Sequence, residues 1–112
     1  MISNPPAGLA YTELAGSQDH HAVGASAWEA WDISAIVPAG ARVVEVMVEN
    51  IAQAAVLTFG CRDSGSALAR LTQHDATVLK TMTMLCPCTL QTIEIYAQMV
   101  AGTHFSIIGY WA

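Results

Sequence analysis

The feature that most constrains the fold is an alternation of apolar and polar side chains along residues 42–50. Val44, Val46 and Val48 fall on one side of an extended chain, and two glutamates fall on the other. Successive side chains of a β-strand point to opposite faces, so the pattern predicts a strand with one buried face and one wetter face. Nowhere does the sequence show a helical periodicity longer than a turn.

Other segments show the same alternation of apolar and polar residues. Turn signals separate them at intervals of roughly 8–12 residues, which is the spacing of a sandwich or a barrel. Besides 42–50, we expect strands at residues 9–14, 28–34, 54–62, 68–71, 77–85, 91–99 and 104–111. The sequence therefore predicts one all-β domain of about seven or eight strands over residues 9–112. Residues 1–8 contain Pro5 and Pro6 and are expected to form an extended arm.

Local signals predict how two of the strands end. Residues 28–49 are expected to form a first hairpin, closed at residues 37–40, where proline and Gly40 suit a type II turn with a positive φ at glycine. The Cys86-Pro87-Cys88 corner is expected to break the strand before it, because proline cannot donate to the sheet.

The alternation also assigns faces to the later strands. Gly60 lies inside a strand and indicates either a bulge or a close approach of the backbone. In the seventh strand, apolar Ile93, Ile95 and Ala97 should point inward, and the outward positions are Thr92, Glu94, Tyr96 and Gln98. In the last strand we expect one face to hold Phe105, Ile107, Gly109 and Trp111.

The composition points to a surface that is partly covered. Hydrophobic residues make up 54% of the 112 residues and charged residues only 12%, against about 25% charged in ordinary soluble domains. A small domain needs a polar surface, and this chain has few charged residues for one. We therefore expect other copies of the chain, or a partner, to cover part of its surface. The alternative is a neutral surface of Ser, Thr, Gln and Ala.

Several classes of function are not expected. Four basic residues and a net charge of −5 do not make a track for phosphates, so no nucleic acid is expected. No basic amphipathic face and no run of about 20 apolar residues occur, so no membrane is expected. The first residues lack the charged and apolar regions of a secretory signal. Neither a nucleophile elbow nor a phosphate loop is present, and no catalytic residues are expected.

The three cysteines, Cys61, Cys86 and Cys88, are expected to be free thiols made in a reducing compartment. A Cys-x-Cys pair lacks the third and fourth ligands of a zinc site, and burial as small apolar groups is the simplest interpretation. A metal role and a redox role remain alternatives. His20 and His21 are adjacent and point apart in an extended loop, which opposes shared coordination; no metal and no cofactor are expected.

Two groups of residues are candidates for contacts with other molecules. Arg62 and Asp63 are expected in one loop, and His74 and Asp75 in another. Both loops could lie at one end of a sandwich, where such folds place binding sites. The interface candidates are large aromatic residues and arm prolines: Pro5, Pro6, Trp28, Trp31 and Trp111. Trp28 and Trp31 point to opposite faces of a regular strand, so one should lie in the core and the other at a rim or interface.

Three sequence pieces occur together in this order: WDIS at 31–34 with VPAGA at 37–41, FGCR at 59–62 with GS at 65–66, and IIGYW at 107–111. Their order resembles small β-sandwich modules of tailed-bacteriophage virion proteins, of the tail-fibre, tail-tip or capsid-decoration type. The resemblance covers roughly residues 28–112. It implies a non-enzymatic, jelly-roll-like antiparallel sandwich, often oligomeric, that is made in the host cytoplasm and works as part of a virion.

We expect the chain to differ from that group in standing alone, which favours a capsid decoration or another small accessory protein. It also differs in its thiol-rich corner at 86–88. The function expected from the sequence is therefore a virion structural or accessory protein that self-associates and docks on capsid or tail proteins. The alternative is a receptor- or carbohydrate-binding module that uses the loops at 62–66 and 72–76.

Overall fold

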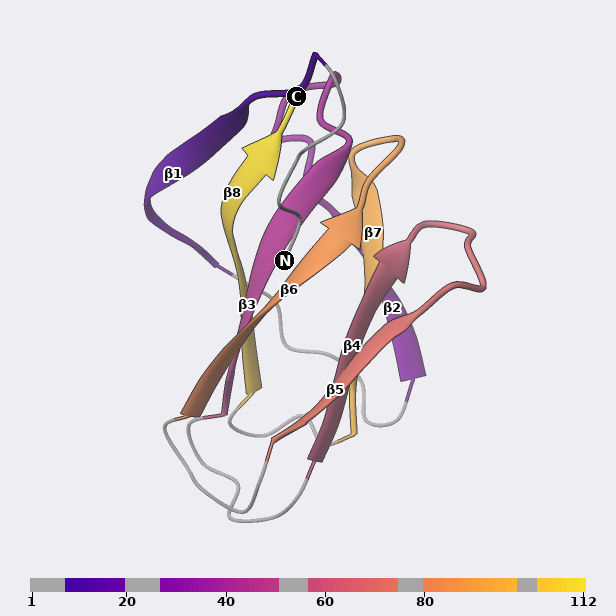
Figure 1. Ribbon diagram of the computed structural model, residues 1–112. Helices are drawn as coiled ribbons and strands as arrows, with labels where there is room; N and C mark the ends of the chain where they lie inside the picture. Colours follow the sequence, from indigo (N-terminus) through magenta and orange to yellow (C-terminus); the bar gives the residue numbers. More distant parts are fainter. Residues whose placement is uncertain (1–7, 20–26, 51–56, 75–79, 99–102) are drawn as a thin grey trace.

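The computed structural model describes residues 8–19, 27–50, 57–74, 80–98 and 103–112. Within these ranges the chain forms β-strands and no helix (Figure 1). The strands are β1 (Tyr11–Asp19), β2 (Ala27–Asp32), β3 (Val43–Asn50), β4 (Leu57–Asp63), β5 (Arg70–His74), β6 (Lys80–Pro87), β7 (Thr92–Ala97) and β8 (Thr103–Trp111). The all-β class expected from the alternation is confirmed.

The eight strands form two four-stranded antiparallel sheets, in the orders β1-β8-β3-β6 and β2-β7-β4-β5, which Figure 1 shows as two layers. Each strand of the first half pairs with its mirror in the second half: β1 with β8, β2 with β7, β3 with β6 and β4 with β5. This nested pairing, spread over two packed sheets, is that of a jelly roll. Among the strands of the described ranges, only β4 and β5 are consecutive in sequence and also neighbours in one sheet.

The prediction of a hairpin at residues 28–49 is wrong, because β2 and β3 belong to different sheets. The segment between them crosses from one sheet to the other. A turn does form there: the Ala41 N–H donates to the Pro38 carbonyl at 3.0 Å. Pro38 is thus the first residue of the turn, and Gly40 does not take the positive φ expected of it. A left-handed glycine occurs instead at Gly65, with φ at 79°, in the turn between β4 and β5.

The core lies between the two inner faces and is made of the residues that the alternation placed there. Val44, Val46 and Val48 of β3 are fully buried, as are Ile93, Ile95 and Ala97 of β7. Phe59 of β4 and Phe105 of β8 meet edge to face across the core, with ring centroids 6.4 Å apart. Burying an aliphatic or aromatic side chain of this size contributes about 1.5–3 kcal/mol.

The face predicted for β8 is correct in its first half and wrong in its second. Gly109 pairs with Glu45 and Ile107 with Val46, so Ile108 is an extra residue, a bulge. One extra residue reverses the faces of all that follow it. Tyr110 consequently packs against the core, and Gly109 and Trp111 belong to the outer face, where Trp111 contacts the ring of Tyr11.

The thiol corner does not break its strand as expected, because β6 continues through Cys86 to Pro87, which pairs with Val43. β6 is the edge strand of its sheet, and an edge strand tolerates a residue that cannot donate a hydrogen bond outward. The first strand also differs from its prediction: β1 runs to Asp19, beyond the expected end at residue 14.

Tyr11 of β1 contacts residues of β8 and β3 on the outer face of the first sheet, and these contacts help to hold β1 at the edge of the sheet. The Tyr11 ring lies 4.7 Å from the ring of Trp111, and the Tyr11 hydroxyl donates to Glu45 Oε1 at 2.9 Å. It also covers Gly109, since a Cβ on that glycine would lie 2.1 Å from the Tyr11 hydroxyl oxygen. Partial burial and the bond to the Glu45 carboxylate raise the pKa of Tyr11 to about 12.

Candidate functional site

A cluster of aromatic, charged and amide side chains lies on the outer face of the second sheet. Its centre is a row across the four strands, with Trp28 on β2, Tyr96 on β7, Gly60 on β4 and Leu71 on β5. Gly60 has no side chain to fill the middle of this row. A Cβ there would lie 2.5 Å from Leu71 Cδ2 and 3.3 Å from Trp28 Cη2, so both side chains converge over the glycine.

The close approach predicted at Gly60 is therefore confirmed, and its purpose is to let two large side chains close over the sheet. The Arg70 carbonyl oxygen, 2.9 Å from the same Cβ position, shows that the neighbouring backbone is close as well. Glycine at this position is thus required both by the side chains above the sheet and by strand β5 beside it.

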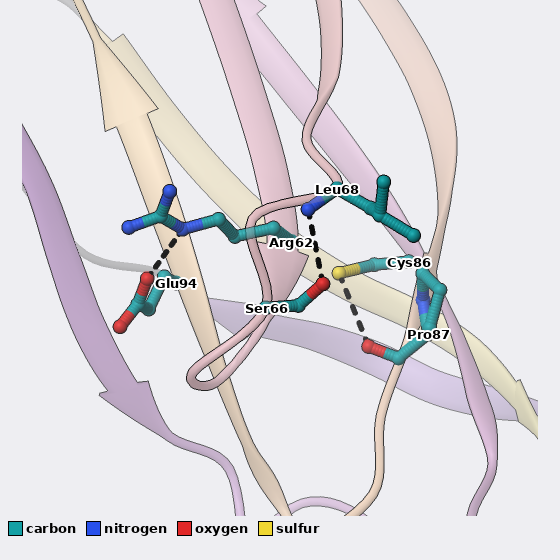
Figure 2. A network of polar contacts seen from close by, with 6 residues as sticks. All are labelled: Arg62, Ser66, Leu68, Cys86, Pro87 and Glu94. Carbon is teal, nitrogen blue, oxygen red and sulfur yellow. Dashed lines mark hydrogen bonds and ion pairs between the residues drawn. The ribbon is translucent and has the colours of Figure 1, made fainter.

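On one side of this row, an ion pair fixes the position of the indole ring. The Arg62 Nε donates to Glu94 Oε1, a contact that joins β4 to β7 (Figure 2). The Arg62 guanidinium carbon also lies 4.1 Å from the Trp28 ring centroid, within cation–π range. Tyr96 contacts the same indole, with ring centroids 5.4 Å apart. Trp28 is consequently held from two directions.

On the other side of the row lies a shallow groove of about 370 Å³. It is lined by Trp28, Thr58, Leu71, Tyr96 and Gln98. The Thr58 N–H donates to Gln98 Oε1 at 3.0 Å, and the Gln98 N–H donates to the Thr58 carbonyl at 3.1 Å. The amide of Gln98 is thereby oriented by the strand next to it. Chemically, the groove offers two aromatic rings, an amide, hydroxyl groups and no net charge.

The structure does not bring the predicted loop residues together. Arg62 and Asp63 lie at one end of β4, whereas His74 pairs with Leu57 at the other end of the same strand, about 20 Å away by strand rise. The expectation of one shared end is therefore wrong for these residues, and His74 belongs to β5, not to a loop. Asp75 lies outside the described residues. A binding role for each residue remains a prediction.

Asp63 has a clear local task. Its carboxylate accepts from the Thr89 N–H at 3.0 Å and from the Thr89 hydroxyl, and it thereby ties the β4–β5 connection to the β6–β7 connection. A carboxylate that accepts two bonds in this way positions loops. Asp63 acts here as a brace between two turns at the same end of the sandwich.

The three tryptophans have three different surroundings. Trp31 is 9% exposed and belongs to the core, whereas Trp28 is half-buried on the outer face of β2. This is the division between core and rim expected from their alternation. Trp111 lies half-buried against Tyr11. Pro5 and Pro6 lie outside the described residues, and an interface role for any of these candidates remains a prediction.

The three cysteines are buried and free. Cys61 belongs to β4 and Cys86 to β6, in opposite sheets. A hydrogen bond with the Cys61 thiol and, after it, burial raise the pKa of the Cys86 thiol, and burial also raises the pKa of Cys88. Such thiols stay protonated and are poor nucleophiles. Among the described residues no group of three or more His, Cys, Asp or Glu is placed to hold a metal ion. His20 and His21 lie outside those residues.

Sequence reasoning recognised Trp28, Arg62 and Gly60 one at a time, but it missed the groove. The alternation had assigned Tyr96, Glu94 and Gln98 to the outer face of their strand, which was the available signal. What the pattern cannot supply is that β7 lies between β2 and β4. Only this neighbour relation assembles the cluster.

No known protein family matches the sequence, and comparison with curated proteins finds none that is significantly similar to it. In the part of the chain that the structure describes, no helix has the length and apolar character needed to cross a membrane.

Proposed function

We propose that this protein is a non-enzymatic structural or accessory protein of a virion, which self-associates and docks on a larger particle. The jelly-roll topology supports this proposal, because the architecture is common among viral capsid domains, although it also occurs in lectins and other proteins. The three sequence pieces that resemble phage virion modules support it independently. A fold alone does not specify a function, so the proposal depends mainly on the surface.

The observation that carries the proposal is the exposure of large apolar side chains at one end of the sandwich. Leu68, in the β4–β5 connection, is 76% exposed, and Leu90, in the β6–β7 connection, is 79% exposed. The bonds between Asp63 and Thr89 hold these two connections together. We call Leu68 and Leu90 the leucine end.

Hydrogen bonds to the backbone fix the conformation of the loop that carries Leu68. The Leu68 N–H donates to Ser66 Oγ at 3.0 Å (Figure 2). The Ser66 N–H donates to the Asp63 carbonyl at 3.0 Å. These bonds fix the backbone that carries Leu68, so little backbone entropy is lost when a partner covers the leucine. In a chain with only 12% charged residues, a second copy is the simplest cover.

Light scattering coupled to size exclusion, over a range from micromolar to millimolar chain, tests the proposal. The wild type should form a defined oligomer, and the double variant Leu68→Ser with Leu90→Ser should be monomeric. Leu71→Ser is the matched control, since Leu71 is an exposed leucine on the sheet face (60%) and outside this end. Because all three side chains are exposed, we expect the melting temperatures to stay close to that of the wild type.

Two outcomes would contradict the proposal. A wild type that stays monomeric at millimolar concentration would remove self-association. Loss of the oligomer in Leu71→Ser, with retention in the double variant, would place the contact on the sheet face instead of the leucine end. The alternative, a receptor- or carbohydrate-binding module that uses the two predicted loops, is supported less well. Arg62 lies near one end of β4, whereas His74 of β5 pairs with Leu57 at the other end.

A further inference from the structure

We propose that the groove on the outer face of the β2-β7-β4-β5 sheet binds a neutral saccharide of one or two rings. This site lies on strands and not on the loops considered above. The inference goes beyond the proposed function and does not depend on it. A virion protein and any other protein with this surface would bind the sugar in the same way.

The side chains that line the groove match the two surfaces of a sugar ring. A pyranose has an apolar face of C–H groups, which packs against aromatic rings, and a rim of hydroxyl groups, which both donate and accept hydrogen bonds. The groove supplies the rings of Trp28 and Tyr96 for the first. For the second it supplies the hydroxyls of Thr58 and Tyr96 and the amide of Gln98, groups that donate and accept.

The groove is also organised before any ligand arrives. Arg62 and Tyr96 hold the Trp28 ring, and the strand bonds between Thr58 and Gln98 hold the amide. Binding then orders few protein groups, and weak individual contacts suffice for a measurable affinity. Gly60 contributes by its lack of a side chain, because it lets Trp28 and Leu71 approach from opposite sides.

The charges beside the groove favour a neutral ligand. Arg62 lies over the indole, and its charge is balanced by Glu94 on the adjacent strand. An anionic sugar would have to compete with that carboxylate for the guanidinium. The five lining residues carry no formal charge themselves.

The size of the groove favours a small ligand over a protein. Its volume of about 370 Å³ is within the usual range for small-molecule sites. A stable protein interface needs about 800 Å² on each partner, which is far more than five side chains around a shallow groove provide. A protein partner is therefore the competing outcome of the test and not the inference.

Titration of the full chain with free sugars, followed by amide and indole NMR signals, tests the inference. The probes are the neutral disaccharides lactose, maltose, cellobiose and chitobiose, with sialyllactose as the anionic comparison, each up to about 20 mM, a range suited to millimolar affinity. At least one neutral disaccharide should shift the indole signal of Trp28 and amides at residues 58–60 and 96–98 in a saturable manner.

Two variants and one control locate the site. Gln98→Ala removes an exposed amide and should weaken binding about tenfold, the loss of one good hydrogen bond. Tyr96→Leu keeps bulk on the sheet but removes the ring and the hydroxyl, and it should weaken binding at least as much. Thr83→Ala, an exposed position on the other sheet, should leave binding unchanged. Dispersed NMR spectra of each variant check that it is folded.

The inference is overturned if none of the neutral probes gives a saturable shift, if sialyllactose binds more tightly than lactose, or if the shifts map to other residues. It is also overturned if Gln98→Ala dissociates a wild-type oligomer, because the groove would then be a protein contact. The monomeric leucine-end variant should still bind the sugar, so this result and the result on self-association can fail separately.

Discussion

Replacement of Gly109 by alanine should destabilise the protein through one contact, that with Tyr11. The alanine Cβ would lie 2.1 Å from the Tyr11 hydroxyl oxygen and 2.4 Å from its Cζ. Carbon atoms in good contact are about 3.5–4.0 Å apart, so the tyrosine ring has to move away. The backbone is not the obstacle, because Gly109 has no positive φ that alanine would resist.

The loss of folding free energy can be estimated from the two contacts that the Tyr11 ring gives up when it moves. Its hydrogen bond to Glu45 at 2.9 Å is of a kind that contributes about 0.5–1.5 kcal/mol. Its packing on Trp111 is of a kind that contributes a similar amount, about 0.5–1.5 kcal/mol. Tyr11 is 44% exposed, so both should lie near the lower end of these ranges. Alanine in a strand recovers about 0.5 kcal/mol or more of chain entropy relative to glycine. The net loss should be about 0.5–1 kcal/mol.

Urea unfolding of four proteins measures this loss: the wild type, Gly109→Ala, Tyr11→Ala and the double variant. In the Tyr11→Ala background, Gly109→Ala should be neutral or slightly stabilising, because the clash no longer exists. Gly40→Ala is the matched control, since a Cβ there meets nothing within 4 Å. The reasoning is refuted if Gly109→Ala costs the same in both backgrounds, or if it costs nothing in the wild type.

Three further predictions can be tested by unfolding experiments. A double-mutant cycle with Arg62→Ala and Glu94→Ala should give a coupling of about 0.5–1 kcal/mol that declines in 1 M salt; a coupling of zero in urea unfolding would contradict the ion pair. The pKa of Tyr11 rises from 10.0 to about 12 on folding, so the unfolded chain releases this proton first, and stability should fall as the pH rises from about 10 to 12. Thermal melts of Tyr11→Phe should show a smaller decline over that window, and an identical decline would refute the assignment. Phe105→Ala should cost about 3–5 kcal/mol in urea unfolding, because its ring is fully buried against Phe59; a loss below about 1 kcal/mol would mean that this part of the core is loosely packed.

The alternation of side chains predicted the core well because burial is a local property of a strand. Val44, Val46 and Val48 had to face one way together, and hydrophobic burial decides which way. The same logic failed after Ile107, because a bulge inserts one residue without a signal in residue type. Ile108 is as apolar as its neighbours, yet it reverses Gly109 and Trp111.

The partners of each strand were beyond the reach of the pattern. Residues 33–42 contain a turn in either case, and nothing local distinguishes a hairpin from a connection between two sheets. The candidate groove could not be predicted for the same reason. Trp28 and Gly60 lie near each other because β7 pairs with both of their strands, and this pairing has no local signal in the sequence. Pro87 shows a related limit of the sequence. A proline excludes a central strand, but it does not distinguish the end of a strand from an edge strand that continues through it, as β6 does.

The pairing of the first and last strands brings the two ends of the described domain together. Ala10 and Ala112 exchange two backbone hydrogen bonds, at 3.0 and 3.1 Å, so their Cα atoms are about 5.5 Å apart, as in any such antiparallel pair. A domain that enters and leaves at one point can be spliced into a surface loop of a host protein without stretching it. The same proximity allows a short linker to close the chain into a ring, with new termini cut in the turn at Gly65.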